Sequence, residues 1–409
     1  MRFDLLLQGG TVLDPASGLH AKKDIAISDG KIAAIDNHIP AETAVRAADV
    51  SGLLVTPGLI DMHCHFHPNF PVEEDGLSCI NADAHLFQSG VTTAVDTGSC
   101  GPRDFIYFKE RVLDKSRVRL FAFVNIADGG MVNINRENDP RHFVPHIAAA
   151  IAKSYPGRVV GIKSAHYWVG KPFDKEHPPW ASIDACIQAA RESGTRALID
   201  FQPTLPERTY HELLLEKLSP GDMHTHLYAQ QFPIFDENGK VNDFLWQAKK
   251  RGILFDLGHG SGSFWFRNAI PALEQGYLPD TLSTDLYLNN VAGPVFSLCN
   301  IMSKYLSMGM ELVEVIKRVT TAPANIIGDS GLGRLTVGGV ADVAVLRQLT
   351  GEFGYADAGG ARLRGTKRVE CVLTVREGKV VYDLEALTLP DWENAPESYW
   401  IPPGVIEYN

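Results

Sequence analysis

The 409-residue sequence is poor in cysteine, with six residues that lie far apart and form no CxxC pair. So few thiols in so long a chain exclude a small disulfide-stabilised fold, and we interpret them as reduced. No run approaches 18 apolar residues, which excludes a transmembrane helix, and the first residues, MRFDLLLQGG, lack the apolar core of a signal peptide. These absences predict a soluble, cytoplasmic protein.

Basic residues are also too few for a nucleic-acid-binding protein. Lys and Arg number 38 against 49 Asp and Glu, for a net charge of −11, the wrong sign for a phosphate backbone or an anionic membrane. The sequence has neither a G-x-S-x-G motif nor a Gly-rich P-loop, which disfavours a serine hydrolase and an NTPase. We therefore expect a small-molecule substrate as partner, and neither nucleic acid nor membrane.

Both ends of the chain show short β-rich runs separated by turn residues. Near the start, DIAISDGKIAAI places Asp29-Gly30 between two such runs, which predicts a tight β-hairpin. Near the other end, Glu377-Gly378 separates two more. We predict that residues 1–55 and 336–409 together build one small β-sandwich domain, with a surface tail at the C-terminus. Such an exposed sheet domain leaves room for a homo-oligomer.

Residues 56–335 instead alternate β runs with helical stretches, which predicts parallel strands covered by helices. Amphipathic stretches that stop at Gly194 and Gly252 lead directly into strands. The span of about 280 residues suits an α/β fold of the (β/α)8 TIM-barrel type. The eight strands that we predict are Leu59–His65, Val91–Asp96, Leu120–Ile126, Val159–Ser164, Ala197–Phe201, Met223–Leu227, Ile253–Leu257 and Thr281–Asp285.

The strongest local motif is PGLIDMHCH, which places His63 and His65 at the end of the first barrel strand. Residues at i and i+2 of a strand share one face, so both imidazoles point the same way. Two neutral histidines at a barrel mouth can hold a divalent transition metal. Cys64, between them, points to the other side, and we expect it to pack.

Four other predicted strands end in residues able to bind a metal, at the face where barrel enzymes keep their active sites. These residues are Lys163, Asp200, His226 and Asp285. A lone ammonium in a barrel interior is costly. Lys163 is therefore expected to extend its charged end to solvent, to pair with an acid, or, beside two histidines and two aspartates, to react with CO2 and give an anionic carbamate that could bridge two metals.

Taken together, the sequence resembles the amidohydrolase superfamily, in its dihydroorotase-like amidohydrolase/deacetylase group. The resemblance covers essentially the whole chain and includes VTPGLIDMHCH, GVTTAVDTGS, TTAPANIIG and GLGRLTVGGVADVAVL. It implies a barrel flanked by a β-sandwich built from both termini. It also implies a binuclear centre, usually of zinc, in which His63, His65 and Asp285 hold one ion, His226 helps to hold the other, and carboxylated Lys163 bridges them.

Two residues depart from the pattern of that group. Asp200 stands where a histidine is usual, so either the second ion has an oxygen ligand or its site is weak and one ion suffices. His67 stands where dihydroorotases have an arginine that grips the substrate carboxylate, which disfavours dihydroorotase itself. The cofactor prediction is thus one or two divalent ions, with zinc expected, and a CO2-derived carbamate on Lys163.

The predicted reaction is hydrolysis of an amide, carbamate or ester bond in a small molecule, such as an N-acyl amino acid or an acylated hydroxy acid. A metal-bound hydroxide attacks, Asp285 is the catalytic base, and His259 and His67 are candidate substrate contacts. The loops Pro68–Asn81, Gly129–Pro140 and Tyr167–Pro178 are expected to set the specificity. The alternatives are a cyclic amidohydrolase of the dihydroorotase or hydantoinase type, and a non-catalytic member of the group.

Overall fold

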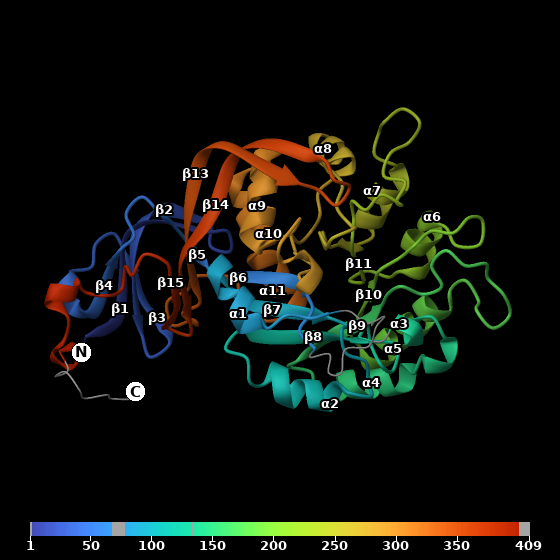
Figure 1. The fold of residues 1–409 in the computed structure, drawn as a ribbon, viewed down its shortest axis with the longest axis horizontal. Coiled ribbons are helices and arrows are strands. Elements are labelled where there is room, and N and C mark those ends of the chain that lie inside the picture. Colours follow the sequence, from blue (N-terminus) through green and yellow to red (C-terminus); the bar gives the residue numbers. More distant parts are fainter. Residues whose placement is uncertain (1, 68–77, 133, 401–409) are drawn as a thin grey trace.

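The computed structural model describes residues 2–67, 78–132 and 134–400, and it contains two separate sheets (Figure 1). The part of the Pro68–Asn81 loop from 68 to 77 lies outside the described residues. One sheet combines strands from both ends of the chain, so that blue and red ribbons lie side by side. The other sheet is parallel and comes from the middle of the chain.

The terminal sheet has eight strands in the order β15-β14-β13-β5-β1-β2-β3, with β4 paired to β1. The two chain ends meet where β13 pairs antiparallel with β5, which confirms that both termini build this sheet. Its strands are β1 (Phe3–Asp14), β2 (Leu19–Ser28), β3 (Lys31–Asp36), β4 (Ala44–Asp49), β5 (Leu54–Pro57), β13 (Val343–Ala356), β14 (Arg362–Arg376) and β15 (Lys379–Asp383).

The hairpin predicted at Asp29-Gly30 is confirmed, and Glu377-Gly378 also joins two antiparallel strands. Asp29 and Gly30, between β2 and β3, have φ angles of 50° and 74°, and Glu377 and Gly378, between β14 and β15, have 49° and 75°. Two successive residues with positive φ match the twist of an antiparallel pair. This is why a polar residue followed by glycine marks each turn in the sequence.

The parallel sheet has seven strands in the order β12-β11-β10-β9-β8-β7-β6, so each strand pairs with its neighbour along the chain. It is curled, and each strand overlaps one of the first seven predicted strands, although the last two are shorter than expected. The strands are β6 (Leu59–Cys64), β7 (Val91–Thr97), β8 (Arg119–Asn125), β9 (Val159–Ser164), β10 (Arg196–Ile199), β11 (Met223–His224) and β12 (Leu254–Phe255).

The eighth predicted strand, Thr281–Asp285, is not a regular strand. It contributes isolated parallel bridges from Thr281 to Asp256 and, one residue beyond its end, from Leu286 to Cys64. These bridges link the two edges of the parallel sheet. A continuous ladder does not form because the backbone N–H of Thr284 donates to the Asp61 carboxylate, at 3.1 Å, and Asp285 has a left-handed φ of 54°.

Helices follow most strands of the parallel sheet, and α5 and α7 end before Gly194 and Gly252 as predicted. The helices are α1 (Ala82–His85), α2 (Phe105–Phe108), α3 (Ile134–Glu137), α4 (Pro145–Ser154), α5 (Ala181–Ser193), α6 (Tyr210–Glu212), α7 (Asp243–Lys250), α8 (Phe266–Glu274), α9 (Leu298–Ser307), α10 (Leu312–Arg318) and α11 (Thr321–Ile327). Short 3-10 turns lie at Ala41–Thr43, Phe87–Ser89, Pro140–His142, Leu288–Asn290, Trp392–Asn394 and Glu397–Tyr399, and π-helical turns at Lys109–Leu113 and Leu213–Lys217.

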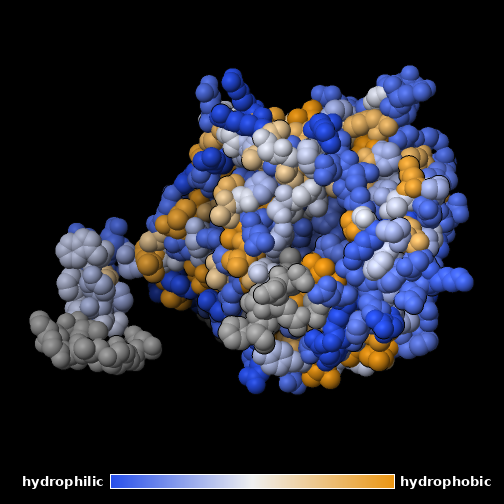
Figure 2. All heavy atoms as spheres, turned by 45° about the vertical axis from the view of Figure 1, so that its right-hand side comes forward, coloured by the Kyte–Doolittle hydropathy of each residue, from blue (hydrophilic) through white to orange (hydrophobic). Residues whose placement is uncertain are grey.

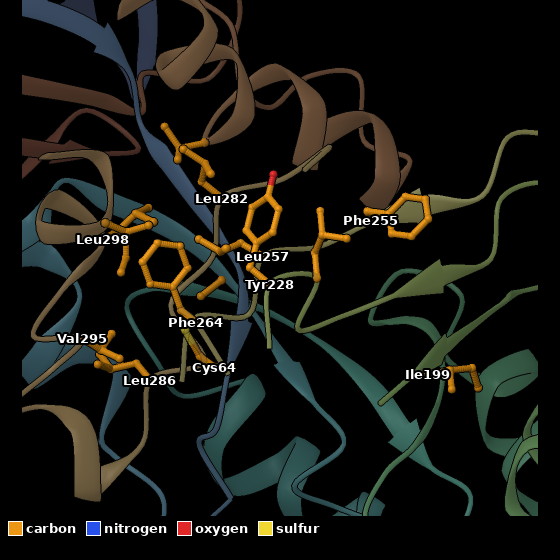
Figure 3. Packing of buried hydrophobic residues seen from close by; sticks show 14 of the residues in the cluster. Cys64, Ile199, Tyr228, Phe255, Leu257, Phe264, Leu282, Leu286, Val295 and Leu298 are labelled. Atoms are coloured by element: carbon orange, nitrogen blue, oxygen red, sulfur yellow. The ribbon is translucent and has the colours of Figure 1, made fainter. Parts of the chain in front are cut away.

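The largest hydrophobic core extends along the parallel sheet and the helices that cover it. Figure 3 shows part of this core, in which Cys64 lies in one cluster with Phe264 and Leu286. This placement confirms that Cys64 packs. All six cysteines are free thiols, as predicted.

The face drawn in Figure 2 is mostly hydrophilic, with hydrophobic residues in small scattered groups and a hollow near its centre. Within the described residues, none of the helices combines the length and the apolar character needed to span a bilayer.

Candidate metal centre

Three predicted ligands come together at the carboxyl end of β6. His63 and His65 direct their Nε2 atoms at the same carboxylate oxygen, Oδ1 of Asp285, at 3.5 and 2.9 Å. One ligand atom from each residue lies within 4.8 Å of the other two, and the group can hold a metal ion. We call these three residues the first corner. They come together because β6 and the 281–286 segment are bridged at Cys64 and Leu286.

Hydrogen bonds at Nδ1, on the side of each ring away from Asp285, orient the two imidazoles of the first corner. Nδ1 of His63 donates to Oδ2 of Asp256, at 3.0 Å, and Nδ1 of His65 is hydrogen-bonded to Oγ of Ser99, at 2.8 Å. Partners of this kind fix the ring orientation and the tautomer of a metal-binding histidine. In His63 the hydrogen bond leaves the Nε2 lone pair facing inward, in the state that a metal requires.

Electrostatics keep this corner in the protonation state that binds cations. Burial and the nearby Lys163 charge lower the pKa of His63 to about 4, so its ring is neutral at neutral pH. Burial alone would raise the pKa of Asp285, but His63 and His65 outweigh it and lower that pKa to about 2. At neutral pH His63 is thus neutral and Asp285 is ionised, so neither residue has to lose a proton before a metal binds.

His226 and Asp200 form a second, looser group with His166, which we call the second corner. Nε2 of His226 lies 3.6 Å from Oδ2 of Asp200, and Nε2 of His166 lies 3.9 Å from the same oxygen. The Asp200 side chain turns inward, with 15 % of its surface exposed. Nδ1 of His226 donates to the Gly258 carbonyl at 2.6 Å, and Nδ1 of His166 to Glu137 at 2.8 Å.

The charges of the second corner differ from those of the first. Burial lowers the pKa of His226, but the Asp200 carboxylate outweighs it, and the net shift is upward. For His166, too, burial works against Glu137 and Asp200, which together raise the pKa to about 9. Protons therefore compete with a metal for His226 more strongly than for His63.

The charge of Lys163 acts on a histidine of each corner, His63 and His226, but its Nζ has no hydrogen-bond partner. Lys163 is fully buried. Its Cβ and Cγ lie 2.8 Å from where a Cβ on Gly98 would be, so glycine at that position makes room for the lysine stem. A buried ammonium with no hydrogen bond is costly, whereas a carbamate on Nζ would present oxygen atoms to a cation.

The two predicted substrate contacts lie in different surroundings. His259 is fully buried; its Nδ1 is 2.8 Å from the Gly260 carbonyl and its Nε2 is 2.7 Å from Nζ of Lys304. His67 packs near Phe108, with ring centroids 5.2 Å apart, and lines a cavity of about 440 Å³ that contains neither corner. For both residues, contact with substrate stays a prediction.

Sequence reasoning missed the residues that support the ligands. Asp256 connects His63 to Thr281 and Ser283 through hydrogen bonds of 2.6 to 3.0 Å. In the sequence, the only indication of this role is that Asp256 is an acidic residue near the end of a predicted strand. Ser99 belongs to GVTTAVDTGS, where Asp96 accepts from the Gly98 and Ser99 N–H groups and so fixes the turn. His166 was not among the predicted ligands or substrate contacts.

The known proteins that this chain resembles include hydrolytic enzymes that act on C–N bonds. A deacetylase of Brucella anthropi is 30 % identical over 348 residues, which cover 83 % of each chain. A crystal structure of an adenine deaminase superposes with a TM-score of 0.82 at 27 % identity, over 93 % of this chain and all of that one. A crystal structure of a dihydroorotase gives 0.79 at 27 % identity, over 93 % and 99 %. No family model matches the chain.

The fold and the metal-binding cluster are those of a metal-dependent hydrolase. The chain belongs to the amidohydrolase superfamily, among its dihydroorotase-like members. It is accordingly a hydrolytic enzyme that acts on C–N bonds. Members of this superfamily generally use a divalent metal, and His63, His65 and Asp285 are a donor set that fits one.

Proposed function

We propose that the protein removes the acyl group from a small N-acyl amino acid or acylated hydroxy acid, by hydrolysis of an amide, carbamate or ester bond. The observation that carries this proposal is the convergence of His63 and His65 on the Asp285 carboxylate. The similarity to a protein named deacetylase over 83 % of the chain supports the reaction type.

The first ion, with zinc expected, would be held by His63, His65 and Asp285. A second ion would take His226 and Asp200, and a carbamate on Lys163 would join the two; the unpartnered Nζ of Lys163 supports this role. When bound, a divalent ion lowers the pKa of water and polarises the substrate carbonyl. The fold that suits this arrangement is an eight-stranded barrel over residues 56–335, with 281–286 as its last strand, and a β-sandwich from 1–55 and 336–409.

Asp285 is the proposed catalytic base. Its carboxylate is ionised at neutral pH because its pKa is about 2, and it can accept the proton of the attacking water and pass it to the leaving nitrogen or oxygen. Its position is fixed by Asn290, whose Nδ2 donates to the Asp285 carbonyl at 2.6 Å. Gly260 leaves space at the carboxylate, because a Cβ there would lie 2.4 Å from Oδ2.

A cyclic amidohydrolase is the second candidate function. The similarity to a dihydroorotase crystal structure at a TM-score of 0.79 supports it. Against dihydroorotase itself stands His67, in place of the arginine expected after the histidine pair. Its ring also faces a cavity that neither corner lines.

Metal analysis and a substrate panel test these functions. Protein produced with zinc and bicarbonate is expected to carry one to two equivalents of metal and to hydrolyse N-acetyl amino acids or O-acetyl hydroxy acids. Turnover of hydantoins or cyclic imides instead would favour the second candidate. Protein that binds no metal under these conditions would refute both.

A further inference from the structure

A small cavity of about 190 Å³ opens beside the second corner. Asp200 and His166 form part of its wall, and the loop after β10 supplies Phe201, Gln202 and Arg208. The cavity thus joins two residues of the candidate centre to a cationic side chain that the proposed chemistry does not use. None of the metal-ligand predictions included Arg208.

The Arg208 guanidinium is buried and held on three sides. Its residue is 2 % exposed, and its Cζ lies 5.2 Å from the ring centroid of Phe173 and 5.3 Å from that of Phe201. Its Nη1 donates to the carbonyls of Tyr167 and Pro179, both at 3.3 Å. The main chain is fixed too, because Arg208 and Thr204 exchange two backbone hydrogen bonds, of 2.7 and 2.9 Å.

The other edge of the guanidinium has no partner. Nε and Nη2 are both buried and make no hydrogen bond, and no carboxylate among the described residues forms an ion pair with Arg208. Burial lowers the pKa of Arg208 only to about 10, so the group stays charged at neutral pH. The Asp200 carboxylate in the same cavity acts on Arg208 through its charge but accepts no hydrogen bond from it. Two buried N–H donors without an acceptor are unfavourable, so this edge calls for a partner that is not part of the chain.

Nε and Nη2 lie on one edge of the planar group and donate in parallel, which matches the two oxygens of a carboxylate. The aromatic faces of Phe173 and Phe201 and the two carbonyls on Nη1 hold this edge ready, so little side-chain entropy is lost when an anion binds. The small volume of the cavity suits a single carboxylate-bearing group of modest size rather than an extended chain.

We propose that Arg208 binds the carboxylate of the substrate through Nε and Nη2, and so selects N-acyl amino acids or acylated hydroxy acids over neutral acyl compounds. This inference rests on the proposed function, since it assigns the carboxylate that those two substrate classes share. It makes Arg208 a specificity-determining residue, separate from the metal ligands and from the base.

The test compares a carboxylate substrate with its neutral isostere. For N-acetylphenylalanine and N-acetylphenylalaninamide, the parent is expected to favour the carboxylate in kcat/KM by about 100-fold, equivalent to about 2.8 kcal/mol. Arg208→Met should lose about this factor on the carboxylate and change by less than about threefold on the carboxamide. Arg208→Lys keeps the charge without the paired donors, and should recover only part of the preference.

Arg251→Met is the matched control. Arg251 also donates to main-chain carbonyls, those of Leu214, Leu215 and Leu218, but it does not line the cavity. It should therefore leave the carboxylate preference unchanged. An equal loss on both substrates in Arg208→Met, or a parent without carboxylate preference, would mean that Arg208 only supports the loop, and would overturn the proposal.

Calorimetric binding of the same two compounds separates this inference from the proposed function. If neither compound is hydrolysed but the parent binds the carboxylate and Arg208→Met does not, the deacylation proposal fails and the Arg208 assignment stands. If the parent binds both compounds alike, or binds neither, the assignment fails whatever the catalytic result. Should Arg208→Met fail to fold, Arg208→Lys and the preference of the parent decide the question.

Discussion

The two corners of the candidate centre are built from similar residues but differ in the spacing and the charge of their ligands. In the first corner, His63 and His65 aim at Asp285, and each ring is held from behind by a side chain, Asp256 or Ser99. In the second corner, Asp200 replaces an expected histidine, and its contacts with His226 and His166 are 3.6 and 3.9 Å. The second-corner rings are also hydrogen-bonded at Nδ1, to Gly258 and Glu137, so the comparison teaches that ligand spacing and charge, and not ring support alone, distinguish a prepared metal site from a looser one.

The largest effect is expected from Asp285→Asn in the first corner. The change removes the proposed base and one ligand charge but leaves both histidines, so turnover should fall at least about 1,000-fold while most of the metal stays bound. Steady-state kinetics and metal content of the same preparation check this. Activity within about tenfold of the parent would rule out the base role of Asp285.

Asp256→Asn tests the support behind the first corner. The amide keeps the shape of the side chain but has one acceptor oxygen instead of two. It can therefore no longer accept all four hydrogen bonds that the carboxylate accepts, from His63, Thr225, Thr281 and Ser283. Affinity for the first ion should fall by about 10- to 100-fold, as measured by competition with a chelator. Asp243→Asn, on the exposed side of α7, is the matched control and should bind metal like the parent. An unchanged affinity in Asp256→Asn would show that the corner does not depend on this support.

Substitution of Asp200 tests the second corner. Asp200→Ala should weaken the second ion by about tenfold or more and leave the first unchanged, whereas Asp200→His should bind the second zinc more tightly, because imidazole is the better zinc ligand. Zinc titration of metal-free protein by calorimetry gives both affinities. If Asp200→Ala lowered the zinc affinity of the first corner instead, the assignment of Asp200 to a separate second corner would be wrong.

The smallest expected effect is a difference in pH dependence between the corners. The pKa of His63 is lowered to about 4, whereas that of His226 is raised. Protons compete with metal for a ring below its own pKa, so lowering the pH should release metal from the second corner before the first. Metal content after dialysis at a series of pH values between about 8 and 5 should fall in two steps. The first step, which reports release from the second corner, should be absent in Asp200→Ala. A single step in the parent would contradict the difference between the corners.

The sequence predicted the parts of the site that depend on local pattern. His63 and His65 lie on one side because residues at i and i+2 of a strand do so, and the parallel strands were predicted from their apolar runs and glycine ends. Hairpin turns at Asp29-Gly30 and Glu377-Gly378 follow from the left-handed conformation that such pairs adopt.

The rest could not be predicted because it depends on contacts across long stretches of chain. Asp256 reaches His63 across 193 residues, and nothing near Asp256 distinguishes it from a surface acid at a strand end. Arg208 lies in a polar loop, and only the cavity reveals its unpaired edge. The irregular backbone of 281–286 results from the Asp61 side chain, which captures an N–H that a strand would use.

Anomalous diffraction at the zinc absorption edge, from crystals grown with zinc, tests the central claim most directly. We expect a peak within about 2.0–2.2 Å of Nε2 of His63, Nε2 of His65 and a carboxylate oxygen of Asp285, at usual zinc–ligand distances. A map with these three side chains in place and no peak among them, from protein that hydrolyses its substrate, would contradict it.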